Sequence, residues 1–571
     1  MAVFIWDCLL CLLPLLLLLL LSLALRWPRL QCWLRLAVKA AAWRLWVTVC
    51  WVLELPLHRN DRTWTKQTGP PGTDNMSGPG QTDRPSLACK PTALAHHLRR
   101  HCGSLASPRL AAWPRGDAHL QTLSGLLWGN QGGGRWEDEV QFTRDHLSLR
   151  DGGIVALDWA VGTRLGGRGE EGRREHQSGG KALGCHTSTP PVLLLIPQCW
   201  GGVTPHLKGL CRLALRQGFY AVVFHPRGTA GCPLTTPRLT EFGDPADLEQ
   251  AVAYVRGRHP SSVLVAVSEG SGSGLLLSYL GECGSSSYLT AAAAISPVLQ
   301  GQLWFETAMP PIYRWGALFH RKLQLSRYAS SFSAVLDVDR ALSCSSLRDF
   351  EEALFCSAPQ PQQKPPSSPT SSSHPPRGLG PSVAWALGER AYPATDWDSY
   401  WERNEPLRDA DEVAVPLLCI RSRDDPLLPP ASTMPLPLFQ SNPYFLLVMT
   451  DRGGHCGFTL EGRDEGEGGM EKGGIGNGEV EEGNWSHVAV LEYFRVVADF
   501  LKGEERDGVR WGGAGGEYGP AGQRSRTGNM ATAPPRRRRA TVMRRPRQQT
   551  HEQVYEEAED GEFTWKRSHT R

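Results

Sequence analysis

The chain has 571 residues, of which 41% are hydrophobic, and its formal net charge at pH 7 is +3. That length and composition fit one large α/β domain with added segments, and the charge of the whole chain singles out no acidic or basic partner. The 15 cysteines are scattered without paired spacing, so no disulfide framework is predicted. The sequence also carries no glycine-rich phosphate loop and no signature of a nucleic-acid-binding fold.

Residues 8–25 are almost purely leucine, and about 18 such residues can just cross a hydrocarbon core about 30 Å thick. Basic residues follow this segment rather than precede it, which by the positive-inside rule keeps the body of the protein cytosolic. We therefore predict a single-pass signal-anchor over residues 1–25, in the endoplasmic reticulum membrane. The alternative is a signal peptide cleaved near Ala24 and a secreted protein. Glycans on Asn75 or Asn484 would favour that alternative.

Residues 26–104 are expected to contain an interfacial stretch and a linker. The Trp-rich part, residues 34–57, either lies in the lipid headgroup layer or packs on the domain, and the Gly/Pro-rich part, residues 60–85, is a linker. Further on, Cys89 and Cys102 bracket three histidines, but they stand too far apart for a zinc knuckle. We predict no metal site there.

Strand and helix patterns alternate through an ordered domain predicted to span residues 105–503. This order favours a mostly parallel, doubly wound α/β sheet with a lid-like region over residues 297–400. The predicted strands are residues 140–150, 154–161, 192–197, 220–225, 263–267, 291–296, 415–422 and 444–450, and clear helices are residues 207–217 and 246–258. Low-complexity insertions over residues 162–190, 359–382 and 462–483, and the charged tail over residues 504–571, are predicted to be disordered.

The stretch from Val263 to Leu280 has the strand–turn–helix pattern of a nucleophile elbow, in which Gly-x-Ser-x-Gly lifts a serine above an α/β sheet. Here the five-residue frame reads Ser268-Glu-Gly-Ser-Gly272. The nucleophile position therefore holds Gly270, which has no side chain to attack with.

The other two members of a catalytic triad are present in the expected chain order. Asp425 follows the predicted strand 415–422, where a triad acid sits, and His455 lies in a Gly-rich turn after the last predicted strand. A histidine in that position serves as the base, and the carboxylate orients it.

Several motifs of this chain recur together in one known family, and the sequence resembles the AB hydrolase 4 family over residues 105–501. The resemblance implies an α/β-hydrolase fold, membrane anchoring and a carboxyl-ester substrate with an acyl chain. It also implies that the backbone N–H groups of Cys199 and Ser271 form the oxyanion hole. The motifs are His119-Leu-Gln-Thr122, Asp151–Trp159, His225-Pro-Arg-Gly228, Leu234–Arg238, Asp424-Asp-Pro426 and Gly453–Phe458.

Three interpretations of the altered elbow stay open at this stage. The chain has no efficient hydrolysis, or Ser271 beside the vacant position attacks, or Ser268 does so from two residues earlier. A nucleophile displaced by about 1 Å can cost about 100-fold in rate, which favours the first. His455 and Asp425 would then persist as a hydrogen-bonded pair that joins two loops.

We therefore predict a lipid-metabolism protein with weak or absent esterase activity, which acts through His455 and Asp425 without a metal or organic cofactor. The rival hypothesis is an inactive scaffold or lipid sensor docked on the membrane, with an unidentified protein partner.

Overall fold

The computed structural model describes residues 86–105, 110–111, 116–128, 140–161, 189–199, 201–307, 309–333, 335–357, 390, 392–460 and 483–512. The predicted signal-anchor, the Trp-rich stretch, nearly all of the three insertions and the charged tail beyond residue 512 lie outside these residues. The tail was expected to be disordered from residue 504, but its first residues, 504–512, continue the last helix, Trp485–Gly512. Within the described part, no helix is both long and apolar enough to cross a bilayer. The chain divides into two compact units, residues 1–499 and 500–571.

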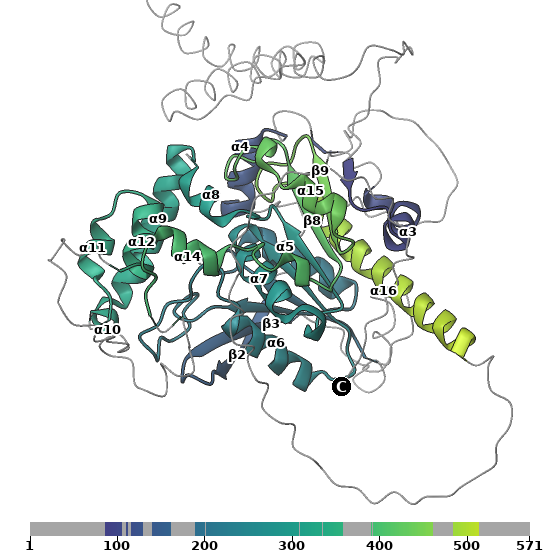
Figure 1. Cartoon of the computed structure of the whole chain (residues 1–571), viewed down its shortest axis with the longest axis horizontal. Coiled ribbons are helices and arrows are strands. Elements are labelled where there is room, and N and C mark those ends of the chain that lie inside the picture. The colour runs from purple at the N-terminus through teal and green to yellow at the C-terminus, as the bar shows by residue number, and fades with distance from the viewer. Residues whose placement is uncertain are drawn as a thin grey trace, which may run out of the picture. The chain divides into compact units, whose positions relative to one another are not determined.

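A nine-stranded sheet forms the centre of the first unit, in the order β1-β9-β8-β7-β6-β4-β5-β3-β2 (Figure 1). The pairs from β5 through β4, β6, β7 and β8 to β9 are parallel, whereas β1–β9, β2–β3 and β3–β5 are antiparallel. The mostly parallel sheet is thus confirmed. Its strands are β1 (Ser86–Ala88), β2 (Gln141–Ser148), β3 (Ile154–Val161), β4 (Val192–Ile196), β5 (Tyr220–His225), β6 (Leu264–Glu269), β7 (Ala291–Ile295), β8 (Leu417–Ser422) and β9 (Phe445–Thr450).

Every strand expected from the sequence is present within two residues of its expected ends, but the ordered part begins before Leu105. β1 pairs with β9 through Ser86, Leu87 and Ala88, and helix α3 follows it. Three residues are too few to show the alternation by which a strand is recognised in a sequence, so this edge strand was not predicted.

Helices connect the strands, and α5 shows how well-defined the start of such a helix is. α5 begins with Pro205 in its first turn, and the Thr204 hydroxyl accepts a hydrogen bond from the Leu207 N–H, which are two common start signals. The helices are α3 (Ala93–His101), α4 (Ala118–Leu123), α5 (Pro205–Arg216), α6 (Ala246–Arg258), α7 (Ser273–Cys283), α8 (Gly301–Glu306), α9 (Pro311–Arg327), α10 (Ala329–Phe332), α11 (Val338–Ser343), α12 (Leu347–Phe355), α14 (Trp397–Asn404), α15 (Leu436–Ser441) and α16 (Trp485–Gly512).

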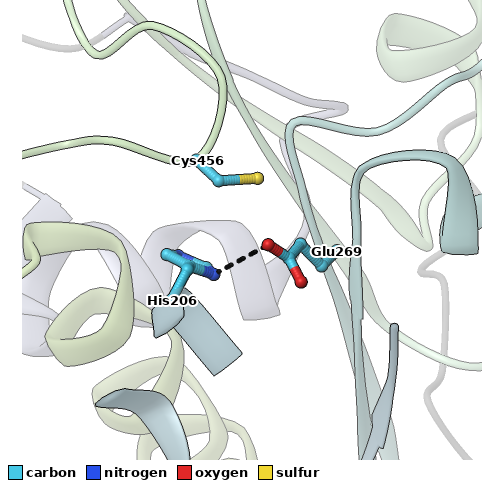
Figure 2. Close-up of side chains that lie close together, drawn as sticks. All are labelled: His206, Glu269 and Cys456. Carbon is cyan, nitrogen blue, oxygen red and sulfur yellow. Dashed lines mark ion pairs between the residues drawn. The ribbon is translucent and has the colours of Figure 1, made fainter. Parts of the chain in front are cut away.

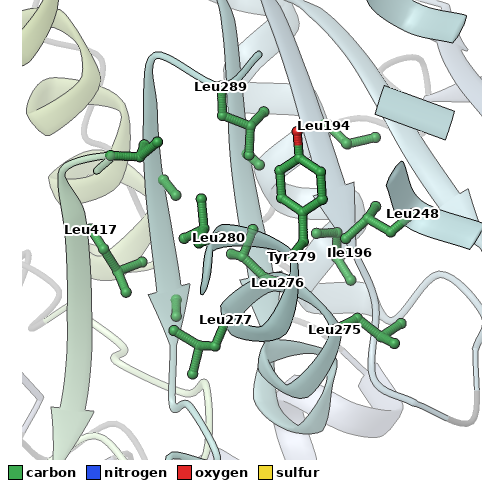
Figure 3. Packing of buried hydrophobic residues seen from close by; sticks show 14 of the residues in the cluster. Leu194, Ile196, Leu248, Leu275, Leu276, Leu277, Tyr279, Leu280, Leu289 and Leu417 are labelled. Atoms are coloured by element: carbon green, nitrogen blue, oxygen red, sulfur yellow. The ribbon is translucent and has the colours of Figure 1, made fainter. Parts of the chain in front are cut away.

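The main core forms where α6 and α7 pack on the sheet, and Figure 3 shows its centre. Tyr279 and Leu276 of α7 face Leu194 and Ile196 of β4 there. Leu193, the strand residue between them, is fully buried as well and points to the opposite face. Both faces of the central strands are therefore covered, which explains their nearly continuous apolar sequences.

The segment between β7 and β8 forms a separate helical layer with its own apolar cluster. α8 to α12 and α14 lie in this segment, and α9, α11 and α12 group together at the left of Figure 1. Trp304, Phe350, Tyr400 and Trp401 are among the buried residues of the cluster. Apart from the end of α14, this layer lies within residues 297–400, the region predicted to be lid-like, and its role as a lid stays a prediction.

A buried ion network joins three of the motifs that carry the family resemblance. The guanidinium of Arg227 donates to Asp247 at 2.6 and 2.8 Å and to Asp151 at 2.9 Å. Arg238 also bonds to Asp151, at 3.2 Å. Burial would raise the pKa of Asp151, but the two arginines hold it below its usual value. These motif residues therefore have a structural role, away from the predicted catalytic pair.

Replacing Arg227 with Met would leave Asp151 and Asp247 buried without their shared cation. We expect the free energy of unfolding to fall by about 3–5 kcal/mol, measured by urea denaturation of the full chain. The control is Arg258→Met, because Arg258 pairs with Asp145 at 2.7 Å but its side chain is 51% exposed. That variant should lose less than about 1 kcal/mol. Equal losses in the two variants would contradict a stabilising role for the buried network.

Candidate active site

The three positions expected to form a catalytic triad lie at one edge of the sheet. Gly270 directly follows β6, Asp425 lies three residues beyond β8, and His455 lies in the turn after β9. β6, β7, β8 and β9 are consecutive parallel strands of the sheet, so their carboxyl ends meet at the same edge. The fold thus brings together residues that are far apart in the chain.

His455 and Asp425 form a buried, hydrogen-bonded pair. The Nδ1 atom of His455 lies 2.9 Å from Oδ2 and 3.2 Å from Oδ1 of Asp425, and both side chains are almost fully buried. Burial alone would lower the pKa of His455, but the Asp425 carboxylate and the Cys456 thiol hold it well above its usual value. The structure therefore brings the two predicted residues together, with the imidazole held by its Nδ1 side.

The loop that carries His455 is fixed by hydrogen bonds from surrounding elements. The N–H of His455 donates to the Thr122 hydroxyl at 2.9 Å, and the N–H of Cys456 donates to the Ser296 hydroxyl at 3.0 Å. Gly454 has φ of +53°, and a side chain there would collide with the Ala118 carbonyl oxygen. Glycine is needed at this position both for its backbone conformation and for the close approach.

Gly270 occupies the position that faces the base. Its φ is +51°, and a Cβ atom built on it would lie only 2.7 Å from Nε2 of His455 and 3.4 Å from Cγ of Gln198. The turn after β6 thus has the strained, outward-facing geometry of an elbow, and His455 lies closer than a side chain at position 270 would allow. No side-chain nucleophile stands opposite the imidazole at this position.

Ser271 points away from His455 and toward the loop that contains Cys199, which we call the oxyanion loop. Its buried hydroxyl accepts a hydrogen bond from the Cys199 N–H at 3.1 Å. That N–H is one of the two donors expected for the oxyanion hole, so the Ser271 hydroxyl occupies the place of the oxyanion. Within the described residues it makes no bond to His455, and the geometry does not favour Ser271 as a nucleophile.

Ser268 lies inside strand β6, where it pairs with Ile196 of β4 and Ala294 of β7. It is fully buried, and its hydroxyl finds no hydrogen-bond partner in the described part of the chain. To reach His455, the strand would have to end two residues earlier, which its ladder pairing opposes. The structure therefore brings neither candidate serine to the base.

Gln198 is a site residue whose role the sequence did not reveal. Its side chain is buried next to Gly270, and among the described residues both its amide oxygen and its amide nitrogen lack hydrogen-bond partners. A buried amide without partners is costly. The amide of Gln198 is therefore an uncommitted hydrogen-bonding group close to Gly270. The sequence likewise showed Thr122 only as part of a motif and did not reveal that it holds the N–H of His455.

Two small cavities, of about 30 and 50 Å³, separate the oxyanion loop from the lid helices. Both are lined by Cys199, Pro226, Thr240 and Arg321. Each has room for only about two to four water molecules.

An elbow turn, a carboxylate and a histidine at the carboxyl ends of a mostly parallel sheet define an α/β hydrolase. No protein-family model matches the chain. Individual proteins do: the chain is 44% identical to the human protein ABHD15 over 426 residues, which are 74% of this chain and 76% of the human protein. The chain belongs to the AB hydrolase family, as its motifs predicted.

More distant relatives are named for lipid chemistry. The chain is 27% identical to the mouse phospholipase ABHD3 over 330 residues, which cover 57% of this chain and 67% of that protein. It is 25% identical to the yeast medium-chain fatty acid ethyl ester synthase/esterase 2 over 334 residues, covering 53% of this chain and 62% of that protein. The chain therefore has the α/β fold of lipid hydrolases.

The pairing of His455 with Asp425 predicts how stability depends on pH. Because the pKa of His455 is raised in the folded state, the pair stabilises the fold fully below an unfolded-state pKa of about 6.5 and loses that effect as the pH rises through the folded-state value. The loss in unfolding free energy caused by Asp425→Asn should thus shrink as the pH rises from about 6.5 into the alkaline range. Urea midpoints of both proteins across this range measure it. A loss that stays constant or grows with pH would contradict the ion pair.

Proposed function

We propose that this chain is a membrane-associated protein of lipid metabolism in which ester hydrolysis is weak or absent. One observation carries the proposal: the His455–Asp425 pair and its supporting loops are intact, whereas the position that faces them is Gly270. The names of the relatives, a phospholipase and an ester synthase/esterase, support a carboxyl-ester lipid as the ligand. No metal or organic cofactor is required for this role.

Without a nucleophilic side chain, hydrolysis would have to use water directly. His455 Nε2 would take a proton from a water molecule beside Gly270, and the resulting hydroxide would attack the ester carbonyl. His455 would then return the proton to the departing alkoxide, leaving a free acid and an alcohol. This route lacks the acyl-enzyme that divides one difficult step into two easier ones. The oxyanion donor of Cys199 is also occupied by Ser271. Both features favour a slow reaction.

The same geometry supports the rival hypothesis, a lipid sensor. The Asp425 carboxylate at Nδ1 raises the pKa of His455, which favours the protonated imidazole, and in that form its Nε2 is a donor. Together with the unpartnered amide of Gln198, this donor suits the carbonyl or carboxylate oxygen of an acyl lipid. Binding without turnover is thus the second candidate function.

Lid helix α9 supports the membrane part of the proposal. Trp315, Phe319 and Leu323 stand four residues apart along it, and their exposed fractions are 62%, 70% and 41%. Residues at this spacing share one face of a helix. α9 contains arginines and a lysine but no acidic residue, a composition that suits an anionic lipid surface. Arg321, on the inner side of the same helix, lines the two cavities.

Restoring a serine tests the enzyme hypothesis. The Cβ atom of a serine at position 270 would lie 2.7 Å from Nε2 of His455, so the free end of the imidazole must move back to admit it. After that shift a hydroxyl faces His455, and we expect Gly270→Ser to raise the hydrolysis of a short-chain p-nitrophenyl ester by about 100-fold over the native chain. Gly270→Ala is the matched control, since it brings the same backbone strain, about 1–3 kcal/mol, without the hydroxyl. Adding Ser271→Ala should free the Cys199 N–H and raise the rate again, by up to about 100-fold.

The gain in activity of Gly270→Ser must also depend on the His455–Asp425 pair, so adding Asp425→Asn to that variant should abolish the gain. If Gly270→Ser folds, as judged by its circular dichroism and thermal midpoint, yet gains no activity, the assignment of position 270 is wrong. If the native chain already hydrolyses the ester rapidly in an Asp425-dependent way, the proposal of weak activity is wrong.

The lid surface is tested by photocrosslinking of the full chain in anionic phospholipid vesicles, with a phospholipid that carries a diazirine in its acyl chain. We expect lipid adducts on the peptide that contains residues 311–327, reduced several-fold by Trp315→Ser combined with Phe319→Ser. Tyr288→Ser is the control, because Tyr288 is equally exposed but belongs to a loop outside the lid. Adducts unaffected by the double variant would rule out α9 as the lipid contact.

A further inference from the structure

Three side chains directly behind the candidate active site form a buried cluster that the chemistry above does not use. His206 lies in the first turn of α5, Glu269 ends β6, and Cys456 follows His455. Figure 2 shows their side chains turned toward one another. One imidazole nitrogen, one carboxylate oxygen and the thiol sulfur all lie within 4.8 Å of each other, and all three residues are buried.

The carboxylate and the imidazole of this cluster are poorly satisfied by the surrounding protein, whereas the Cys456 thiol donates to the Ile295 carbonyl oxygen at 3.8 Å. The Glu269 carboxylate is fully buried, and among the described residues it accepts hydrogen bonds only from the Thr204 hydroxyl, at 2.8 and 2.9 Å. In the described part of the chain no arginine or lysine pairs with it, and its ion-pair contact is Nδ1 of His206 at 3.5 Å. Neither ring nitrogen of His206 has a hydrogen-bond partner among the described residues. A buried carboxylate without a firm cationic partner carries a large desolvation cost.

We propose that His206, Glu269 and Cys456 bind a zinc ion. Imidazole, carboxylate and thiolate are the donors that zinc takes in proteins, and the thiolate selects against the hard cations Mg²⁺ and Ca²⁺. With ligand distances of about 2.0–2.3 Å, tetrahedral donors stand about 3.3–3.8 Å apart. The His206–Glu269 separation of 3.5 Å already lies in this range, and donors within 4.8 Å reach it by shifts of at most about 1 Å. A water molecule would complete the tetrahedron.

The neighbouring His487 does not supply the missing charge. Its ring centroid lies 4.4 Å from that of His206, and among the described residues the ion-pair contact of Glu269 is with His206 and not with His487. A divalent ion balances one carboxylate and one thiolate.

The position of the cluster assigns the ion a structural role. Glu269 is the residue before Gly270, Cys456 is the residue after His455, and His206 follows the oxyanion loop that contains Cys199. One ion would therefore tie together the elbow, the histidine loop and the oxyanion loop. This role does not require the site to hydrolyse esters, so it stands or falls separately from the proposed function.

The test uses the full chain, purified in detergent without chelators. Mass spectrometry with inductively coupled plasma should find a stoichiometric amount of zinc that survives desalting. After exchange with Co²⁺, the absorption spectrum should show tetrahedral ligand-field bands and a thiolate-to-cobalt charge-transfer band. The second measurement needs no variant, so it stays decisive even if the substituted proteins fold poorly.

Variants then assign the ligands. His206→Gln, Glu269→Gln and Cys456→Ser should each lose the metal, and Cys456→Ser should in addition lose the charge-transfer band. Cys211→Ser is the matched control, because Cys211 is a buried cysteine on the same helix as His206 and should keep full metal content. A native chain that retains neither zinc nor cobalt would overturn the proposal. So would a cobalt spectrum without a thiolate band, or zinc that persists in all three variants.

Discussion

The close approach of the Gly270 backbone to His455 is the constraint on which the candidate site depends. The turn after β6 has a positive φ at this residue, and even a Cβ atom would lie 2.7 Å from the imidazole. A serine there would require His455 to retreat, and His455 is held from behind by Asp425 and by the hydrogen bond of its N–H to Thr122. The positions of the elbow, of His455 and of the loop that carries His455 thus fit a glycine at position 270. The Ser271 hydroxyl lies at the oxyanion position, where it accepts the hydrogen bond of the Cys199 N–H, and not toward His455.

The surrounding scaffold explains why a site without its nucleophile keeps its shape. Arg227 neutralises Asp151 and Asp247 inside the fold, and His225 bonds to Asp158 at 2.9 Å, so these motif residues hold strands and loops together. The His455–Asp425 pair likewise joins the loops after β8 and β9. Such a framework keeps Gln198 and His455 in place on either side of Gly270 at the edge of the sheet. Orientation of that kind serves binding as well as catalysis.

Much of this architecture could be read from the sequence, for identifiable reasons. The central strands are buried on both faces and are therefore nearly continuous apolar runs, and the Gly/Ser elbow and the order of Asp425 and His455 follow from a chain order shared by α/β hydrolases. β1 is too short to show a pattern. The direction of the Ser271 hydroxyl depends on a backbone N–H that belongs to another loop. The cluster of His206, Glu269 and Cys456 unites single residues from three distant segments, and no spacing rule connects them.

The central claim is that the native chain lacks a nucleophile opposite His455, and covalent labelling tests it most directly. The full chain in membranes would be incubated with a fluorophosphonate probe until a known serine hydrolase in the same sample is fully modified. Peptide mapping would then cover residues 264–283. The account predicts no adduct on Ser268 or Ser271 in folded protein. An adduct on either serine that disappears in Asp425→Asn would contradict it, and would show that this fold has relocated its nucleophile.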